Sequence, residues 1–176
     1  MIIQGISEQS AGDELEKREI DRIKGEAYFL RGAYYFWLVN LYGKPYTAAT
    51  ATDNPGVPLK ITEYIEDKKF VRNSVQEVYD QVLEDLDKAE TNLENAVHKS
   101  IYRADITAVY LLKSRVYLYM RNWEKAKYYA DKVLEKNDQL VDLNNFDVIS
   151  GKYFLTSESV EIIFSTGNNW IALERT

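Results

Sequence analysis

The longest periodic segment of the chain, residues 13–42, predicts a single helix. Apolar residues recur along it at alternating spacings of three and four, which places them on one face of a helix. This stripe consists of Ile20, Ile23, Ala27, Leu30, Tyr34, Trp37 and Leu41. The second half of the segment is apolar on its other faces too, so we expect neighbouring helices to surround it. Gly43 and Pro45 predict where the helix ends.

The segment 74–94 predicts a second helix. Ser74 and Glu77 have the spacing of a capping box, in which each side chain satisfies a free backbone N–H at the helix start. The apolar stripe of this helix consists of Val75, Tyr79, Val82, Leu86, Ala89 and Leu93.

Two shorter segments, 104–121 and 123–136, predict a third and a fourth helix. Asp105 and Asn122 are the candidate caps at their starts. The link between the two helices is so short that they must pack antiparallel. The inner set of the fourth helix is Trp123, Ala126, Ala130 and Val133, which predicts that the tryptophan ring lies in the core.

Two helical hairpins in succession indicate a repeat. The second hairpin resembles the tetratricopeptide pattern, with small Ser114 and aromatic Tyr117 on its first helix and Asn-Trp-Glu-Lys-Ala at 122–126. The first hairpin fits only if residues 43–73 form a long inserted loop. A loop of that length in a compact helical domain is usually functional or disordered. We therefore expect residues 1–138 to form one helical region with this insertion.

The helical period is lost over residues 139–176. Val160, Ile162 and Phe164 alternate with their neighbours and predict a short strand at 159–166. A lone strand is not stable without partners. We therefore expect this part to be the truncated start of a loop-rich C-terminal portion.

Composition narrows the classes of function. The net charge is −6 with no basic run, which argues against nucleic-acid binding. The chain has no cysteine, which excludes thiolate sites. His98 is its single histidine, and on its own it offers neither an ordinary catalytic triad nor a histidine metal cluster. The carboxylates fall on solvated helix faces, where ordinary acids do not catalyse. No apolar run is long enough to span a membrane. The sequence thus predicts neither an enzyme nor a cofactor or metal site.

The loop at 43–60 holds the best ligand candidates. Tyr46 could stack on a sugar ring, since aromatics with a polar tip suit sugar faces, and Asp53 and Asn54 could bond its hydroxyls. The other interpretation is that Asp-Asn-Pro-Gly, which begins at Asp53, is ordinary turn chemistry. Most of the 14 tyrosines are expected to pack between helices.

Two further side chains need an explanation. Arg31 stands on an apolar face, and a buried arginine needs a carboxylate or carbonyl partner. Trp170 follows Gly-Asn-Asn near the end of the chain and fits either an exposed platform or core packing.

Several segments carry patterns that are typical of one family. The first are Gly25-Glu-Ala-Tyr-Phe-Leu-Arg-Gly-Ala-Tyr-Tyr-Phe36 and Leu41-Tyr-Gly-Lys-Pro45. The others are Gly56-Val-Pro-Leu59, Arg72-Asn-Ser-Val-Gln-Glu-Val-Tyr79, Asp85-Leu-Asp-Lys-Ala89, Arg115-Val-Tyr-Leu-Tyr119, Asn122-Trp-Glu-Lys-Ala126 and Glu161-Ile-Ile-Phe-Ser165. In this order and spacing they resemble the SusD/RagB family of outer-membrane nutrient-binding lipoproteins. The resemblance covers nearly the whole chain.

The resemblance implies a mainly α fold, a SusD-like superhelix of tetratricopeptide-like hairpins. It also implies a protein on the outward-facing surface of the outer membrane that binds oligosaccharides and works with a TonB-dependent transporter. Loops with aromatic platforms bind the substrate in that family. The chain departs from the pattern because it lacks the lipidated N-terminal cysteine, the signal peptide and the long C-terminal half. We therefore expect an N-terminal-half fragment, with membrane attachment only through a lipid anchor that this sequence lacks.

A second hypothesis is a helical-repeat module that binds other proteins and no sugar. The two hypotheses differ in whether the 43–60 loop is ordered and presents Tyr46 to solvent.

Overall fold

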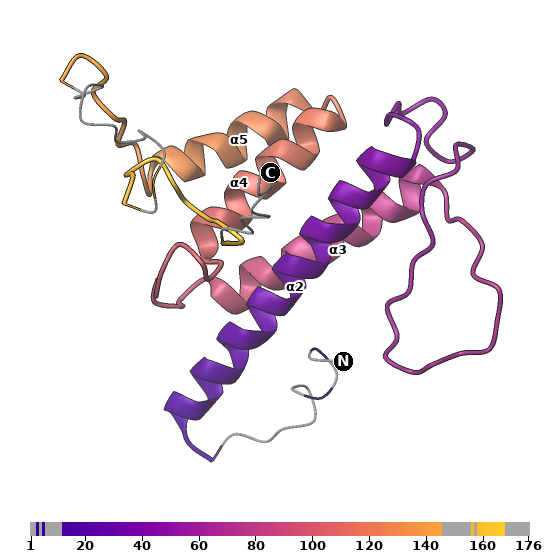
Figure 1. Ribbon diagram of the computed structural model, residues 1–176, viewed down its shortest axis with the longest axis horizontal. Helices are drawn as coiled ribbons and strands as arrows, with labels where there is room; N and C mark the ends of the chain where they lie inside the picture. Colours follow the sequence, from indigo (N-terminus) through magenta and orange to yellow (C-terminus); the bar gives the residue numbers. More distant parts are fainter. Residues whose placement is uncertain (1–2, 4, 6–11, 146–155, 157, 168–176) are drawn as a thin grey trace, which may run out of the picture.

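The computed structural model describes residues 3, 5, 12–145, 156 and 158–167. Within this part the regular structure is helical, without strands, and consists of α2 (Glu14–Tyr42), α3 (Val75–Leu93), α4 (Ile106–Tyr119) and α5 (Trp123–Leu134) (Figure 1). These bounds agree with the predicted segments to within two residues at each end. The predicted mainly α fold is therefore confirmed.

Side-chain caps fix where each helix begins. Asp13 accepts a hydrogen bond from the backbone N–H of Glu16 at the start of α2. The predicted capping box at α3 is complete, and Asp105 and Asn122 cap α4 and α5 as predicted. Each cap satisfies a backbone donor that has no partner within its helix.

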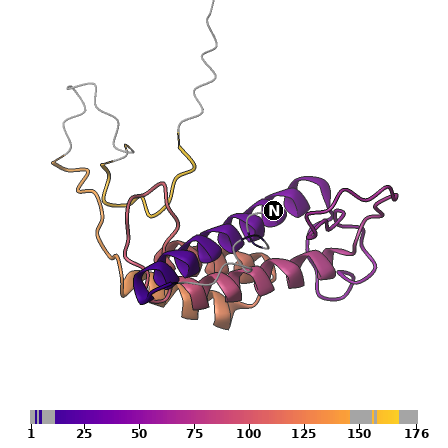
Figure 2. The same ribbon diagram turned by 90° about the horizontal axis from the view of Figure 1, so that it is seen from below.

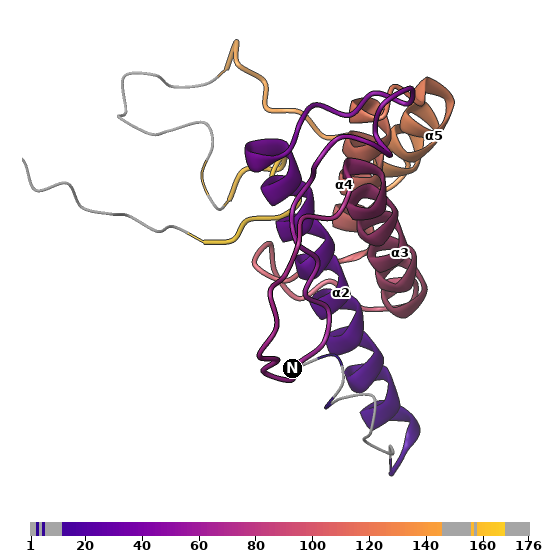
Figure 3. The same cartoon turned by 90° about the vertical axis from the view of Figure 1, so that its right-hand side faces the viewer.

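The helices pack as two hairpins, α2 against α3 and α4 against α5, and α3 joins them by packing on α4 (Figures 1 and 3). Small residues allow the close contacts. A Cβ atom on Gly25 would lie 2.5 Å from Cγ of Leu93 on α3. In the second hairpin, the hydroxyl of Ser114 on α4 donates a 2.8 Å hydrogen bond to the carbonyl oxygen of Ala126 on α5.

The core lies between α2, α3 and α4. The predicted stripe of α3 is buried along its whole length, and α4 contributes Val109, Leu112 and Val116. The buried face of α2 differs from the predicted stripe: it consists of Ile20, Arg22, Gly25, Glu26, Phe29, Gly32, Ala33, Phe36 and Val39. Of the predicted stripe, Leu30, Tyr34, Trp37 and Leu41 are exposed. The expectation that helices surround α2 was therefore wrong for this side, because its glycines and alanine let α3 approach the opposite face.

Trp123 is also placed differently from the prediction. It is the first residue of α5 and is 61% exposed, while Ala126 and Val133 are the buried residues of that helix. Its spacing to Ala126 is compatible with a helix face, but the ring lies at the end of the helix, where α4 does not cover it. Trp170 lies outside the described residues.

The inserted segment 43–73 has an anchored base and a projecting part. Its first half turns back onto α3, where the carbonyl oxygens of Ala51 and Asn54 accept hydrogen bonds of 2.9 Å each from the first N–H groups of the helix. The backbone N–H of Gly56 donates to Asn73, which closes the base of the loop. The hydroxyl of Tyr35 on α2 both accepts from and donates to the backbone of Lys60. Residues 61–71 then extend away from the helices near the C-terminal end of α2 (Figures 1 and 2).

The predicted strand at 159–166 is absent from the described residues. Ser165 donates a backbone hydrogen bond to the carbonyl of Ile101, and the ring of Phe164 packs edge-to-face on Phe29 at 5.0 Å. The alternating apolar residues thus mark a segment that lies against helices, because no neighbouring strand is there to pair with it. No helix in the described part of the chain combines the length and apolar character needed to cross a membrane.

Candidate functional site

A hollow of about 640 Å³ opens where the end of α2, the start of the inserted segment and the end of α4 meet. Its volume lies within the range of small-molecule sites. It is lined by Phe36, Trp37, Asn40, Leu41, Pro45, Tyr46, Arg115, Tyr119 and Arg121.

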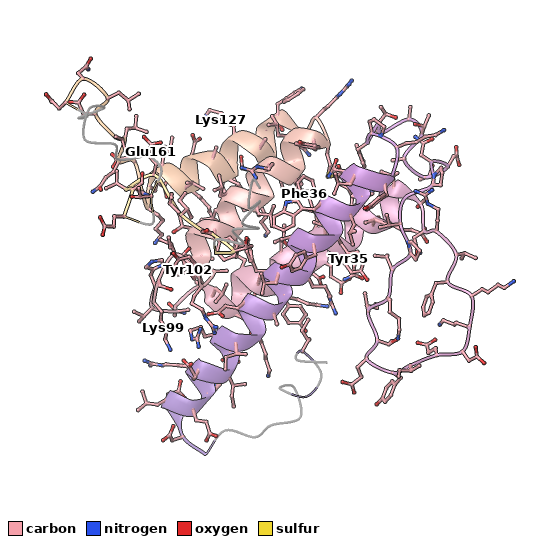
Figure 4. The ribbon with its side chains drawn as sticks, in the orientation of Figure 1. Tyr35, Phe36, Lys99, Tyr102, Lys127 and Glu161 are labelled. Carbon is pink, nitrogen blue, oxygen red and sulfur yellow. The ribbon has the colours of Figure 1, made fainter. Side chains whose placement is uncertain are left out.

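Aromatic rings form one wall of the hollow. Phe36 is buried between α2 and α4 (Figure 4) and packs edge-to-face on Tyr119 at 5.2 Å. Trp37 packs edge-to-face on Tyr34 at 5.4 Å, with the ring planes at 85°. Trp37 and Tyr119 are 40% and 50% exposed, so each ring is held by a neighbour and still reaches solvent. Such rings suit the apolar face of a sugar.

Asn40 adds to the lining an amide whose orientation is fixed by two hydrogen bonds. Its Nδ2 donates to the carbonyl oxygen of Phe36 at 2.6 Å, and its Oδ1 accepts from the hydroxyl of Tyr79 at 3.1 Å. Burial raises the pKa of Tyr79 to about 12, so this hydroxyl stays a donor at neutral pH.

Two arginines, Arg115 on α4 and Arg121 in the turn after it, supply the charge of the hollow. Both are exposed, and no carboxylate in the described part of the chain pairs with either. Arg121 has a φ of 59°, in the left-handed region that favours glycine and asparagine. Neither arginine was among the site residues expected from the sequence. The Arg-Val-Tyr-Leu-Tyr pattern at 115–119 places Arg115 and Tyr119 on one helix face, which is a signal that could have indicated Arg115. No such pattern in the sequence points to Arg121.

Tyr46 lies in the wall of the hollow, but it is partly buried. Its ring packs on Tyr79 at 4.8 Å, and its hydroxyl donates to Oε1 of Gln76 at 2.9 Å. Burial and the nearby carboxylate of Asp80 raise the pKa of Tyr46. One side of the ring is therefore committed to α3. Contact between Tyr46 and a ligand stays a prediction.

Asp53 and Asn54 belong to the turn at 47–54 and do not line this hollow. Nδ2 of Asn54 donates to Oγ1 of Thr50 at 2.8 Å, and the carbonyl oxygen of Asn54 accepts from Val75. Asp53 is exposed at the loop surface. The turn chemistry of this segment is present, and the ligand role of both residues stays a prediction.

A smaller hollow of about 360 Å³ adjoins the first along the α2–α4 contact. The two share Trp37 and Arg115, and the lining of the smaller one also includes Phe164, Ser165 and Thr166. Trp37 and Arg115 thus lie where the two hollows adjoin.

Two buried charges outside this hollow, Asp85 and Lys113, are paired across contacts between helices. Arg31 forms two hydrogen bonds to Asp85 on α3, of 2.8 and 2.6 Å, which confirms that this arginine has a carboxylate partner in the bundle. Lys113, fully buried on α4, donates to Asp87 at 2.5 Å and to Glu90. In the described residues no group of three or more histidine or acidic side chains could hold a metal ion. These charges therefore hold the helices together.

Comparison with known proteins identifies one family from both sequence and structure. A SusD-like family model, described as starch-binding and associating with the outer membrane, matches residues 2–118. SusD-like protein P38 of Formosa agariphila is 34% identical over 106 residues, which are 58% of this chain and 18% of that protein. The crystal structure of a SusD-superfamily protein from Bacteroides thetaiotaomicron is 33% identical, with a TM-score of 0.68 over 79% of this chain and 30% of that one.

A SusD-like carbohydrate-binding protein from Bacteroides vulgatus is 29% identical, with a TM-score of 0.73 over 92% of this chain and 33% of that one. The chain thus spans no more than 33% of the length of any of these three relatives. The family model nevertheless matches more than half of the chain, and both solved structures share its fold. The chain belongs to the SusD-like family.

Proposed function

We propose that this chain is part of a protein that captures oligosaccharides at the outer membrane for import. The observation that carries the proposal is the hollow beside Tyr46, in which Trp37 and Tyr119 offer ring surface to solvent. The family is described as starch-binding, and one solved relative as carbohydrate-binding, which supports the same class of ligand.

In this proposal the sugar stacks on the exposed rings of the hollow. Tyr46 contributes the edge that α3 leaves free, and Asp53 and Asn54 reach hydroxyls of the part of the ligand that extends over the inserted loop. The aromatic contacts supply apolar burial, and the polar groups set orientation. Such a shallow site gives modest affinity, which suits capture followed by release.

The proposal includes capture without chemistry. Asp85 and Glu26, which are both buried, each face an arginine. A glycosidase needs two carboxyl groups that flank one bond, with one of them kept protonated. The ligand therefore leaves unchanged. We further propose that it passes to a TonB-dependent transporter on the outward-facing side of the outer membrane.

Calorimetry of the complete protein with a panel of neutral and acidic oligosaccharides tests the proposal. Trp37→Ala should weaken binding about tenfold, because a stacked aromatic contributes about 1 kcal/mol beyond its buried area. Trp123→Ala is the matched control, because Trp123 is also an exposed tryptophan but does not line the hollow. Equal affinities of the two variants for the glycan would mean that it does not bind in this hollow.

The exposed apolar residues of α2 favour a second candidate, a protein-binding module. Leu30, Tyr34 and Leu41 lie on one side of the helix, and Leu41 is 73% exposed. Exposed apolar patches mark interaction sites in many proteins. Binding to a transporter segment without binding to any oligosaccharide in the panel would favour this function over glycan capture.

A further inference from the structure

We infer that the hollow selects an acidic sugar, one that carries a carboxylate or a sulfate held by Arg115 and Arg121. The inference rests on the proposed glycan binding and names the class of sugar for that same site.

The first support is that these arginines stand apart from the others. The remaining arginines of the described part all have partners: Arg18 with Glu14, Arg22 with Glu19 and Glu26, Arg31 with Asp85, Arg72 with backbone carbonyls, and Arg103 with Glu26. The chain holds 28 acidic and 22 basic residues, so carboxylates are plentiful. Arg115 and Arg121 have no carboxylate partner among the described residues, and both line one hollow.

The second support is the charge of the hollow itself. Its lining includes two arginines and no acidic residue. The apolar wall next to them lowers the local screening by water, which strengthens attraction for an anion. Guanidinium groups bind carboxylates and sulfates through paired N–H donors of matching geometry.

The third support is the conformation of Arg121. Its left-handed backbone, with a φ of 59°, lies in the turn between α4 and α5, where glycine would fit without a steric penalty. A large cationic side chain occupies this position in spite of the local backbone preference. This fits a side chain that acts at the hollow it lines.

The arrangement of groups matches a pyranose with an acidic substituent. Trp37 and Tyr119 offer ring surface to the apolar face of the sugar, and Arg115 lies one helical turn before Tyr119 on the same side of α4. A ring that stacks on these aromatics would place a substituent within reach of the guanidinium groups. A neutral sugar would use the aromatic rings and leave both arginines without an anion.

The test is calorimetry of the complete protein with a galacturonate tetramer, its fully methyl-esterified form and a sulfated galactose tetramer. The acid and its ester share one skeleton and differ in charge. We expect the acid to bind at least about tenfold more tightly than the ester, since charge-assisted hydrogen bonds exceed neutral ones. We also expect the advantage to shrink as salt rises. The sulfated tetramer distinguishes sulfate from carboxylate as the preferred anion.

Arg121→Gly and Arg115→Ala should each remove most of the preference for the acid, so that the acid and the ester bind each variant with similar affinity. Glycine fits the left-handed backbone at 121, so that variant should fold at least as well as the parent. Arg18→Ala is the control, because Arg18 is an exposed arginine that does not line the hollow.

The outcomes separate the inference from the function on which it rests. Equal affinity for acid and ester would overturn the inference and leave glycan capture standing. No binding to any of the three tetramers or to neutral oligosaccharides would overturn both. Binding of an acidic peptide in place of the sugars would assign the arginines to a protein partner and would also overturn the inference.

Discussion

The buried charge of Asp85 is tolerated because a second charge meets it across the contact between two helices. Asp85 is fully buried on α3, yet Arg31 reaches it from α2 with two hydrogen bonds. The sequence could predict that Arg31 needs a partner, because an arginine on an apolar face requires one. It could not predict which carboxylate, since Asp85 lies 54 residues away and only helix packing brings the two together.

Removing one member of this pair should be costly. Asp85→Ala leaves Arg31 without its anion between two helices, so we expect a loss of about 3 kcal/mol in the free energy of unfolding. Urea denaturation measures it. Glu84→Ala is the control: Glu84 pairs with Lys88 at the surface, and its loss should cost less than about 0.5 kcal/mol. Equal effects of the two changes would mean that the Arg31–Asp85 contact does not hold α2 to α3.

Tyr79 links stability to alkaline pH. Burial raises its pKa from 10.0 to about 12, so the fold favours the neutral phenol. This contribution is complete below pH 10 and is lost as the pH rises through about 12. The melting temperature should therefore fall as the pH rises between these limits, and Tyr79→Phe should reduce this fall. At lower pH the same substitution should lower the free energy of unfolding by about 1 kcal/mol, because it removes the hydrogen bond from the hydroxyl to Asn40. Tyr102→Phe, at an exposed tyrosine, should leave the decline unchanged.

At the level of elements, how far a pattern predicts packing depends on how polar its other face is. The buried face of α3 could be predicted from its apolar stripe because charged and polar residues occupy the rest of that helix. On α2 the second half is apolar nearly all round, so periodicity could not select the buried face. Gly25, Gly32 and Ala33 held the missing signal, because small residues mark where two backbones approach. The prediction of a strand at 159–166 was wrong for a related reason. Alternation of apolar and polar residues cannot show whether a partner strand exists.

Two glycines of α2 give a paired test of this close contact. A Cβ atom at Gly25 would meet the buried side chain of Leu93 at 2.5 Å, whereas one at Gly32 would have ordinary contacts from 3.4 Å outwards. Alanine raises intrinsic helix stability by about 1 kcal/mol over glycine. We expect Gly32→Ala to be neutral or stabilising and Gly25→Ala to destabilise by about 1–3 kcal/mol through overpacking. Chemical denaturation gives the free energy of unfolding of each variant. If both substitutions stabilise the protein, α2 and α3 lie further apart than the structure shows.

On the scale of the whole molecule, the hollow is assembled from distant parts of the chain. Trp37, Tyr46, Arg115 and Arg121 come from α2, the inserted segment, α4 and the turn beyond it. The sequence indicated Tyr46 through its loop and composition, but it could not bring the arginines to it, because that depends on how the two hairpins pack. Local turn chemistry was easier to predict, and Asp53 and Asn54 do lie in a turn.

The projecting part of the inserted loop gives the last prediction. Its base is tied to the helices at Tyr35 and Lys60, and Lys68 and Lys69 beyond this anchor are exposed. Within residues 12–145 we expect trypsin to cut first after these two lysines, because exposed loop backbone is cleaved more readily than helices.

The fragments should remain associated after this cut, since α2 and α3 pack along their length. The hollow uses no residue of 61–71, so the cut protein should bind oligosaccharide as the intact one does. Gel filtration and calorimetry after digestion measure both. Loss of binding with the helices still associated would move the ligand from the hollow to the projecting loop.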